Sequence, residues 1–179
     1  MKKTNLKGKN MAVKAVNTEK YLTFHIDNQL YTIPTSEVVE IIRMQPITFM
    51  PNLPDYVKGV INLRGKIVPL IDMRLRFDKE EKEYGARTSV IIVECGEMTV
   101  GLIVDSVKDV RDVADNQISA APKYKKDIGD NYIKGLVSFK EESAMLMDIE
   151  RVLVYKKNVK KKPANDSDEA QDMPKTAVQ

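Results

Sequence analysis

Short apolar runs rich in Val and Ile recur along the middle of the chain, with polar turns close together and no sustained helical period. Two pairs of these runs flank a short polar turn: Leu22 to Ile26 with Leu30 to Ile33, and Val90 to Val93 with Val100 to Val104. Each pair predicts a β-hairpin. Many short strands of this kind are typical of a mainly β protein built as small barrels or a sandwich.

An internal repeat organises the same region. The segment from Asp55 to Leu63 is echoed by the segment from Asn131 to Phe139, each with a Lys-Gly step followed by an apolar run. A polar turn and a second apolar run then end in Asp72 or Asp148, at the same distance from the glycine in both copies. We therefore expect two pseudo-repeats, at about residues 21–85 and 89–154, with a docking groove between two similar barrels.

Short helical turns are expected at three places. A side-chain oxygen that can cap a helix stands before an apolar residue at Thr35/Ser36, at Asp72 and at Asp148. The apolar strand pattern resumes soon after the first of these. Helices should therefore be brief interruptions of a β structure.

The charge lies mainly at the two ends of the chain. The net charge is +3, but five lysines and no acidic residue fall in residues 1–18, and residues 156–179 are also lysine-rich. Both ends are short of large apolar residues, so we expect flexible tails around a domain at residues 19–155. That domain is mildly acidic and lacks the basic face of a nucleic-acid reader. The C-terminal lysines could touch an anionic surface, but a solvated tail is favoured.

Residues for catalysis or metal binding are scarce. The single cysteine, Cys95, and the single histidine, His25, provide no local zinc ligand set and no obvious nucleophile pair. We expect no enzyme activity and no cofactor, although a small hydrolase that uses scattered carboxylates stays open as an alternative. No apolar run is long enough to cross a bilayer, so we expect a protein that is not inserted in the membrane. The single cysteine cannot form an internal disulfide, which favours a cytoplasmic location.

The stretch from Val57 to Arg74, VKGVINLRGKIVPLIDMR, resembles the most recognisable part of CheW-like domains. The resemblance extends from about Tyr21 to Val154 and includes Gly101 to Asp105 and the Tyr132-x-x-Gly135 step. It implies two SH3-like five-stranded β-barrel subdomains around a shared hydrophobic core, with short helices. It also implies a scaffold that couples chemoreceptors to a kinase without covalent chemistry.

The partners that this resemblance implies are the regulatory domain of the histidine kinase CheA and the cytoplasmic tip of chemoreceptors. The protein would then be cytoplasmic and recruited to membrane-associated receptor arrays. An adaptor of the same type for another histidine-kinase pathway, such as surface motility, is the alternative.

The resemblance also assigns candidate residues. Five match family positions for partner binding: Val38, Glu40, Arg64, Val107 and Val110. Glu40 and Arg64 have opposite charges and could pair with each other or with a partner, and Val107 and Val110 could equally be core residues. Four glycines are expected to serve the backbone in tight turns or close packing: Gly59, Gly65, Gly101 and Gly135.

Overall fold

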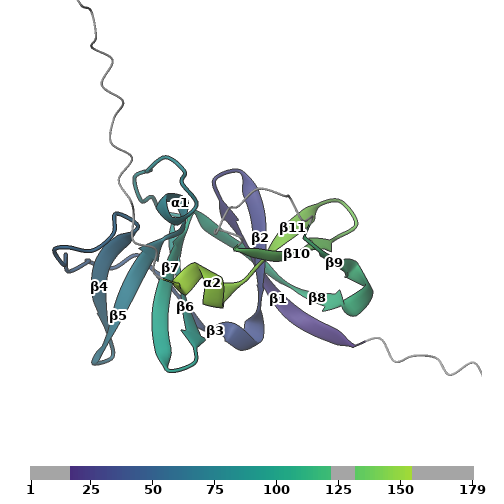
Figure 1. The fold of residues 1–179 in the computed structure, drawn as a ribbon, viewed down its shortest axis with the longest axis horizontal. Coiled ribbons are helices and arrows are strands. Elements are labelled where there is room, and N and C mark those ends of the chain that lie inside the picture. Colours follow the sequence, from purple (N-terminus) through teal and green to yellow (C-terminus); the bar gives the residue numbers. More distant parts are fainter. Residues whose placement is uncertain (1–16, 122–131, 155–179) are drawn as a thin grey trace, which may run out of the picture.

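The computed structural model describes residues 17–121 and 132–154, and it places two small β-sheets side by side with short helices between them (Figure 1). The predicted flexible tails lie outside the described residues, apart from Asn17 and Thr18.

The first sheet has five strands in the order β3-β6-β7-β5-β4. Their bounds are β3 Val38–Arg43, β4 Val57–Leu63, β5 Lys66–Asp72, β6 Ser89–Cys95 and β7 Met98–Val104. The second sheet has six strands in the order β8-β1-β2-β11-β10-β9. Their bounds are β1 Thr18–Ile26, β2 Gln29–Pro34, β8 Ser106–Ala114, β9 Ile118–Ala120, β10 Ile133–Ser138 and β11 Ser143–Met147.

The prediction of two small barrels is confirmed, with one detail added for the second. A single helical turn, η2 (Asp115–Gln117), divides its outer strand into β8 and β9, which accounts for six strands where five were expected. Each sheet is closed by the segment that follows its first edge strand. Thr48, beyond β3, bridges to Val60 of β4, and Ser119 of β9 pairs with Leu136 of β10.

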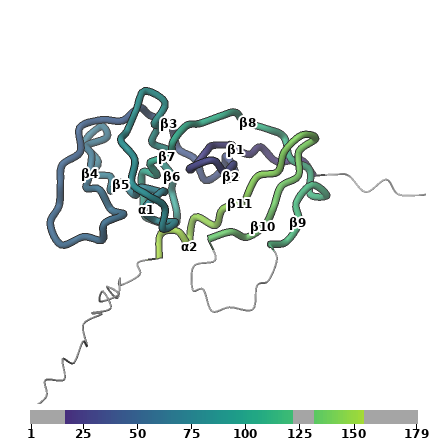
Figure 2. The backbone as a smooth tube through the Cα atoms, turned by 90° about the horizontal axis from the view of Figure 1, so that it is seen from above, coloured from purple at the N-terminus to yellow at the C-terminus, as the bar shows by residue number. Residues whose placement is uncertain are grey.

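The two pseudo-repeats exchange their first hairpins. β1 and β2 come from the first repeat but belong to the second sheet, where β1 pairs with β8 and β2 pairs parallel to β11. β6 and β7 come from the second repeat but join the first sheet in the same manner, pairing with β3 and β5. The chain therefore crosses between the barrels twice, from β2 to β3 and from β7 to β8 (Figure 2).

The core has a shared centre and a separate interior for each barrel. The central cluster draws on both sheets and includes Phe24, Ile33, Ile91, Leu102 and Met147, all at most 1% exposed. Smaller clusters fill the five-stranded and the six-stranded barrel. β6 is buried on both faces, which explains why its sequence is a continuous apolar run rather than an alternating one.

All three predicted helical turns form, and two of them are capped by the predicted residue. Asp72 accepts backbone N–H bonds from Arg74 and Leu75 at the start of α1 (Met73–Arg76), and Asp148 accepts one from Arg151 at the start of α2 (Ile149–Leu153). The turn near Thr35, η1 (Thr35–Glu37), begins one residue earlier than a Thr35 cap would require, and no side chain caps it.

A buried arginine joins the two short helices. Arg76 of α1 is 5% exposed, and its guanidinium donates to the carbonyl oxygens of Val152 (2.9 Å) and Val154 (2.8 Å) and to the hydroxyl of Tyr132. The rings of Tyr56 and Tyr132, which occupy matching positions in the two repeats, contact it at 4.7 and 4.5 Å. A cation held between two aromatic faces and satisfied by carbonyls fixes α2 between the barrels.

Candidate functional site

The β3 strand places alternate side chains inside and outside the five-stranded barrel. Val39, Ile41 and Arg43 are exposed, while Val38 and Glu40 are half-buried. The register against β6 shifts between Val38 and Glu40, so Val39 is the extra residue of a β-bulge. Bulges redirect side chains at sheet edges, and this one directs the Glu40 carboxylate toward the opposite edge of the barrel.

That opposite edge ends in the β4–β5 turn, which carries Arg64. Arg64 and Gly65 both have positive φ, 51° and 86°, as a tight two-residue hairpin turn requires. The Asn62 side chain accepts from the Gly65 N–H at 2.8 Å and closes the turn. The turn therefore presents the Arg64 side chain in a fixed direction.

Arg64 and Glu40 form a bidentate ion pair that joins the β4–β5 turn to the edge strand β3. Both guanidinium–carboxylate contacts are 2.8 Å. The Arg64 side chain is 77% exposed and that of Glu40 is 21% exposed. An exposed pair of this kind contributes at most about 1 kcal/mol to stability, while the arginine remains accessible to another protein.

The barrel that carries this pair also has exposed apolar side chains on β3, on the segment that follows β3 and on the β4–β5 hairpin. Val39 and Ile41 flank Glu40 and are 50% and 44% exposed, and Ile67, on the hairpin that carries Arg64, is 65% exposed. Phe49, in the segment beyond β3, is 77% exposed. Met50 and Leu53 follow it and are also exposed. We call these six residues the apolar face of the five-stranded barrel.

The repeat provides an internal control for this face. Val39 is matched by the bulge residue Lys108 of β8, since Thr23 pairs with Asp109 and Phe24 with Val107. Ile67 is matched by Ser143, and Phe49 by Ala120. The fold tolerates polar or small residues at these three positions, so Val39, Ile67 and Phe49 are not needed to build a barrel, whereas Ile41 is matched by the exposed Val110. Exposed apolar patches of this kind mark interaction surfaces.

The remaining predicted partner-binding residues lie elsewhere. Val107 and Val110 belong to β8 of the six-stranded barrel, so the structure does not gather all five residues on one barrel. Val110 is 51% exposed, whereas Val38 and Val107 pack against the central cluster. The structure thus gives Val38 and Val107 a packing role, and their role in binding stays a prediction.

A second ion cluster joins the β10–β11 turn to β8 in the six-stranded barrel, and the sequence did not predict it. Glu142, on the β10–β11 turn, accepts from Lys108 at 2.6 Å and from Arg111 at 2.8 Å. Hydrogen bonds from Lys108 and Arg111 lower the pKa of Glu142, and Arg111 also lies 4.5 Å from the Phe139 ring centroid. Here the acid lies on the hairpin and the bases on the bulged strand, the reverse of Glu40 and Arg64. Aligning the repeats would have shown Glu142 on the hairpin that matches the one carrying Arg64.

The four predicted structural glycines occupy crowded or left-handed positions. A Cβ on Gly59, whose φ is +136°, would lie 2.3 Å from the Thr48 carbonyl oxygen, and on Gly135 it would lie 2.7 Å from that of Ser119. A Cβ on Gly101 would lie 2.4 Å from Leu70. Gly65 has open space around it, and only its φ of +86° favours glycine.

Within residues 17–121 and 132–154, no group of three or more His, Cys, Asp and Glu residues could hold a metal ion. His25 lies in β1, and its ring is 3.5 Å from the Ser106 hydroxyl. Burial raises the pKa of the Cys95 thiol, and Glu150, Glu37 and Asp148 raise it further. A search of the same described residues finds no helix with the length and apolar character needed to cross a membrane.

The geometry defines a class of protein: two interlocked SH3-like barrels with an exposed ion pair and an apolar face. Residues 20–157 match the family model described as the CheW-like domain. The chain is 38% identical over 135 residues to the chemotaxis protein CheW of Klebsiella aerogenes, covering 75% of this chain and 81% of that protein. It is 33% identical over 135 residues to the chemotaxis protein CheW of Bacillus subtilis, covering 75% and 86%.

A solved structure agrees with these sequence relatives. The crystal structure of the scaffolding protein TtCheW from Thermoanaerobacter tengcongensis superposes with a TM-score of 0.69 at 30% identity, covering 74% of this chain and 90% of that one. The chain belongs to the CheW family.

Proposed function

We propose that this protein is a chemotaxis adaptor that couples chemoreceptors to the histidine kinase CheA by non-covalent binding. Its partners would be the regulatory domain of CheA and the cytoplasmic tip of the receptors, and it would act in the cytoplasm at receptor arrays. Membership of the CheW family supports this function, and the CheW relatives are named as chemotaxis and scaffolding proteins. A binding role without turnover fits this family, and it requires neither a cofactor nor a metal.

One observation supports the proposal most directly: the barrel that carries the exposed Arg64 guanidinium also carries the exposed side chains of the apolar face, three of which the matching barrel replaces by polar or small residues. Protein interfaces combine apolar contact area with charged groups that select the partner. The tight turn fixes the backbone of Arg64, and Glu40 holds its guanidinium group. Arg64 is therefore arranged for recognition in advance, because less side-chain entropy is lost on binding. We therefore assign Arg64, Glu40 and the apolar face to one partner surface, and Val110 on the other barrel to a second.

An adaptor for another histidine-kinase pathway is the second candidate. The chain is 24% identical over 145 residues to Protein FrzA of Myxococcus xanthus, covering 80% of this chain and 90% of that protein. The two candidates share one mechanism, in which contacts that differ between kinase-on and kinase-off assemblies transmit the signal. They differ only in the kinase that is bound.

The first experiment is a pull-down of the full chain with CheA and a soluble receptor tip from the same cell. Arg64→Ala and Glu40→Ala should each lose one partner while keeping the wild-type melting temperature. The matched control is Asp112→Ala, which removes an exposed ion pair with Lys20 (3.0 Å) on the six-stranded barrel. It should retain the partner that Arg64→Ala loses, because it leaves the five-stranded barrel unchanged. If wild type retains neither partner, the coupling role with these proteins is wrong and other histidine kinases should be tested.

A second set of variants tests the apolar face. Phe49→Ser and Ile67→Ser remove exposed side chains that contribute little to the fold, so stability should not fall while binding to one partner weakens at least several-fold. Met98→Ser is the control, because Met98 is 55% exposed on the same barrel but lies on the β6–β7 hairpin outside the apolar face. Equal binding by all three variants would exclude this face as the partner surface.

A further inference from the structure

The two crossings between the barrels are related by the repeat, but Arg74 contacts the first of them, while the matching position near the second carries Glu150. The first joint lies where β7 ends and β8 begins, at Asp105. The second lies where β2 ends and β3 begins, at η1. A cavity opens beside each joint, with volumes of about 670 Å³ and 360 Å³. Their walls are built from matching positions, including Asp72 in one and Asp148 in the other.

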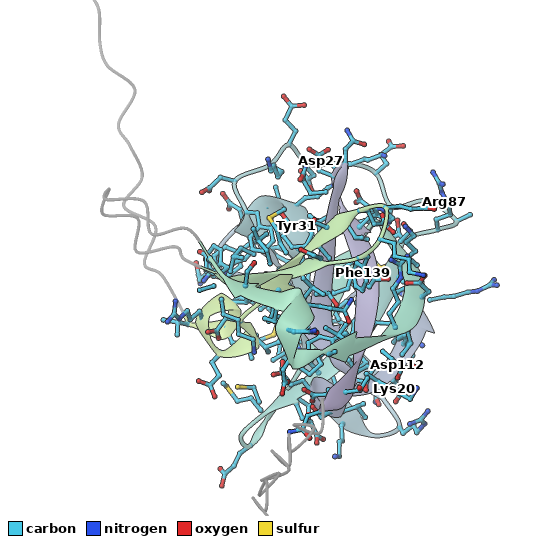
Figure 3. The ribbon with its side chains drawn as sticks, turned by 90° about the vertical axis from the view of Figure 1, so that its right-hand side faces the viewer. Lys20, Asp27, Tyr31, Arg87, Asp112 and Phe139 are labelled. Atoms are coloured by element: carbon cyan, nitrogen blue, oxygen red, sulfur yellow. The ribbon has the colours of Figure 1, made fainter. Side chains whose placement is uncertain are left out.

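Arg74 of α1 ties the first joint together. Its guanidinium makes two contacts of 2.7 Å with Asp105 and one of 3.2 Å with Asp27. Asp105 is the single residue between a strand of the five-stranded sheet and a strand of the six-stranded sheet. Asp27 is in the β1–β2 turn, at the end of β1 opposite to Lys20 and Asp112 (Figure 3).

Backbone contacts add to this joint. The Asp105 N–H donates to the His25 carbonyl at 3.0 Å, and the Asp105 carboxylate accepts from the Asp27 N–H at 2.8 Å. The Arg74 side chain is only 13% exposed. Charge-assisted bonds that are shielded from water are stronger and hold geometry better than exposed ones. Arg74 therefore connects the last strand of one barrel with the first hairpin of the other.

The second joint has acids at this place instead. Glu150 of α2 stands at the position of Arg74, and Gly96 stands at the position of Asp27. Glu37 of η1 lines the cavity, and in the described part of the chain its Oε2 atom is buried without a hydrogen-bond partner. Lys134 lies 3.7 Å from the other oxygen, and burial raises the pKa of Glu37. The two joints thus differ in what holds the barrels together.

We propose that Arg74 is a positioning residue that locks the relative orientation of the two barrels at the first joint, and that the described residues of the second joint form no equivalent lock. β8, with Val107 and Val110, begins one residue after Asp105. Loss of the lock therefore changes how β8 is presented relative to the apolar face. The effect on partners rests on the proposed function, whereas the effect on barrel orientation does not.

The test measures the distance between the barrels with spin labels on the full chain. Labels are placed at Met98→Cys on the five-stranded barrel and Asn116→Cys in η2, after Cys95→Ser removes the native thiol. The wild-type background should give one narrow distance population. Arg74→Gln should broaden or shift it, and Arg74→Lys, which keeps the charge but loses the fork, should give an intermediate width. Lys82→Gln removes a cation from the wall of the same cavity and should leave the distance population as in wild type.

A gain of function strengthens the test. Glu150→Arg puts a guanidinium beside the unpaired Glu37 oxygen, so in the Arg74→Gln background it should narrow the distance population again. Asp27→Asn removes the negative charge from the more distant of the two carboxylates that Arg74 contacts, and it is available if Arg74→Gln fails to fold. The width of its distance population should lie between those of wild type and Arg74→Gln. If Arg74→Gln does not fold, the Asp27→Asn population should still be detectably broader than that of wild type.

An unchanged distance population in a folded Arg74→Gln or Asp27→Asn chain would overturn the lock. Partner binding is measured separately on unlabelled chains. Where the adaptor role holds, Arg74→Gln should weaken the partner bound through β8 while the partner bound at Arg64 is retained. If orientation changes but wild type binds no partner, the lock stands and the proposed function fails.

Discussion

Three glycine substitutions separate backbone strain from close packing in this fold. Gly65 has a φ of +86° and open space around it, so alanine there would meet strain alone. Gly135 has no positive φ, but a Cβ would lie 2.7 Å from the Ser119 carbonyl oxygen, so alanine there would meet crowding alone. Gly59 combines a φ of +136° with a distance of 2.3 Å to the Thr48 oxygen.

The expected losses of stability follow from these differences. Left-handed backbone costs an L-residue about 1–2 kcal/mol, partly offset because alanine stiffens the unfolded chain, so Gly65→Ala should lose about 1 kcal/mol. Crowding typically costs about 1–3 kcal/mol, which we expect for Gly135→Ala. Gly59→Ala should lose about 2–4 kcal/mol, because both costs apply and the crowding atom is backbone that must shift.

Urea denaturation of the four chains measures these values. The midpoint should fall in the order wild type, Gly65→Ala, Gly135→Ala, Gly59→Ala, with an unchanged dependence of the unfolding free energy on denaturant. Gly59→Ala should also increase hydrogen exchange at the Thr48 and Val60 amides, whose bonds of 2.9 Å close the five-stranded barrel. The reasoning is wrong if Gly59→Ala is no less stable than Gly65→Ala, because the approach of Thr48 would then contribute nothing.

Two further predictions concern charged groups. Arg76→Met keeps the volume of a buried side chain but removes three hydrogen bonds and two ring contacts, so we expect a loss of about 2–4 kcal/mol by urea denaturation and faster amide exchange in α2. A loss within error of wild type would contradict the cross-linking role. The pKa of Glu142 lies below its ordinary value of 4.5, so its contribution to stability is present at neutral pH and is lost as the pH falls through that lowered value. Glu142→Gln should therefore be less stable than wild type at neutral pH in low salt, and the difference should vanish at strongly acidic pH; a constant difference would refute the assignment.

Local sequence patterns predicted much of the fold. Short apolar runs on either side of polar turns identified the hairpins, and the repeat is present in three dimensions down to matching hydrogen bonds. The Asp72 amide donates to the Tyr56 carbonyl and the Asp148 amide donates to that of Tyr132, both at 2.7 Å. Capping chemistry located α1 and α2, because a carboxylate before an apolar residue acts within a few residues of chain.

Features that depend on distant pairing could not be predicted in this way. Periodicity shows that β1 and β2 form a hairpin but not which repeat they join, since strand partners are chosen by tertiary packing. The pairing of Glu40 with Arg64 was left open for the same reason. Nothing in the local sequence distinguishes Arg76, which is buried, from Arg64, which is largely exposed, although the repeat places Tyr56 and Tyr132 at matching positions.

The exchange of hairpins also bears on how such a chain could have arisen. One repeat alone cannot complete either barrel, because its first hairpin belongs to the sheet of the other repeat and its remaining strands need the hairpin of that other repeat. Two copies of a single-repeat ancestor could have completed each other as a symmetric dimer, as domain-swapped proteins do. Joining the copies in one chain would have freed each half to change without altering the other. One barrel carries large exposed side chains at Val39, Ile67 and Phe49 where the other has Lys108, Ser143 and Ala120, and in this way a symmetric pair could become an asymmetric connector.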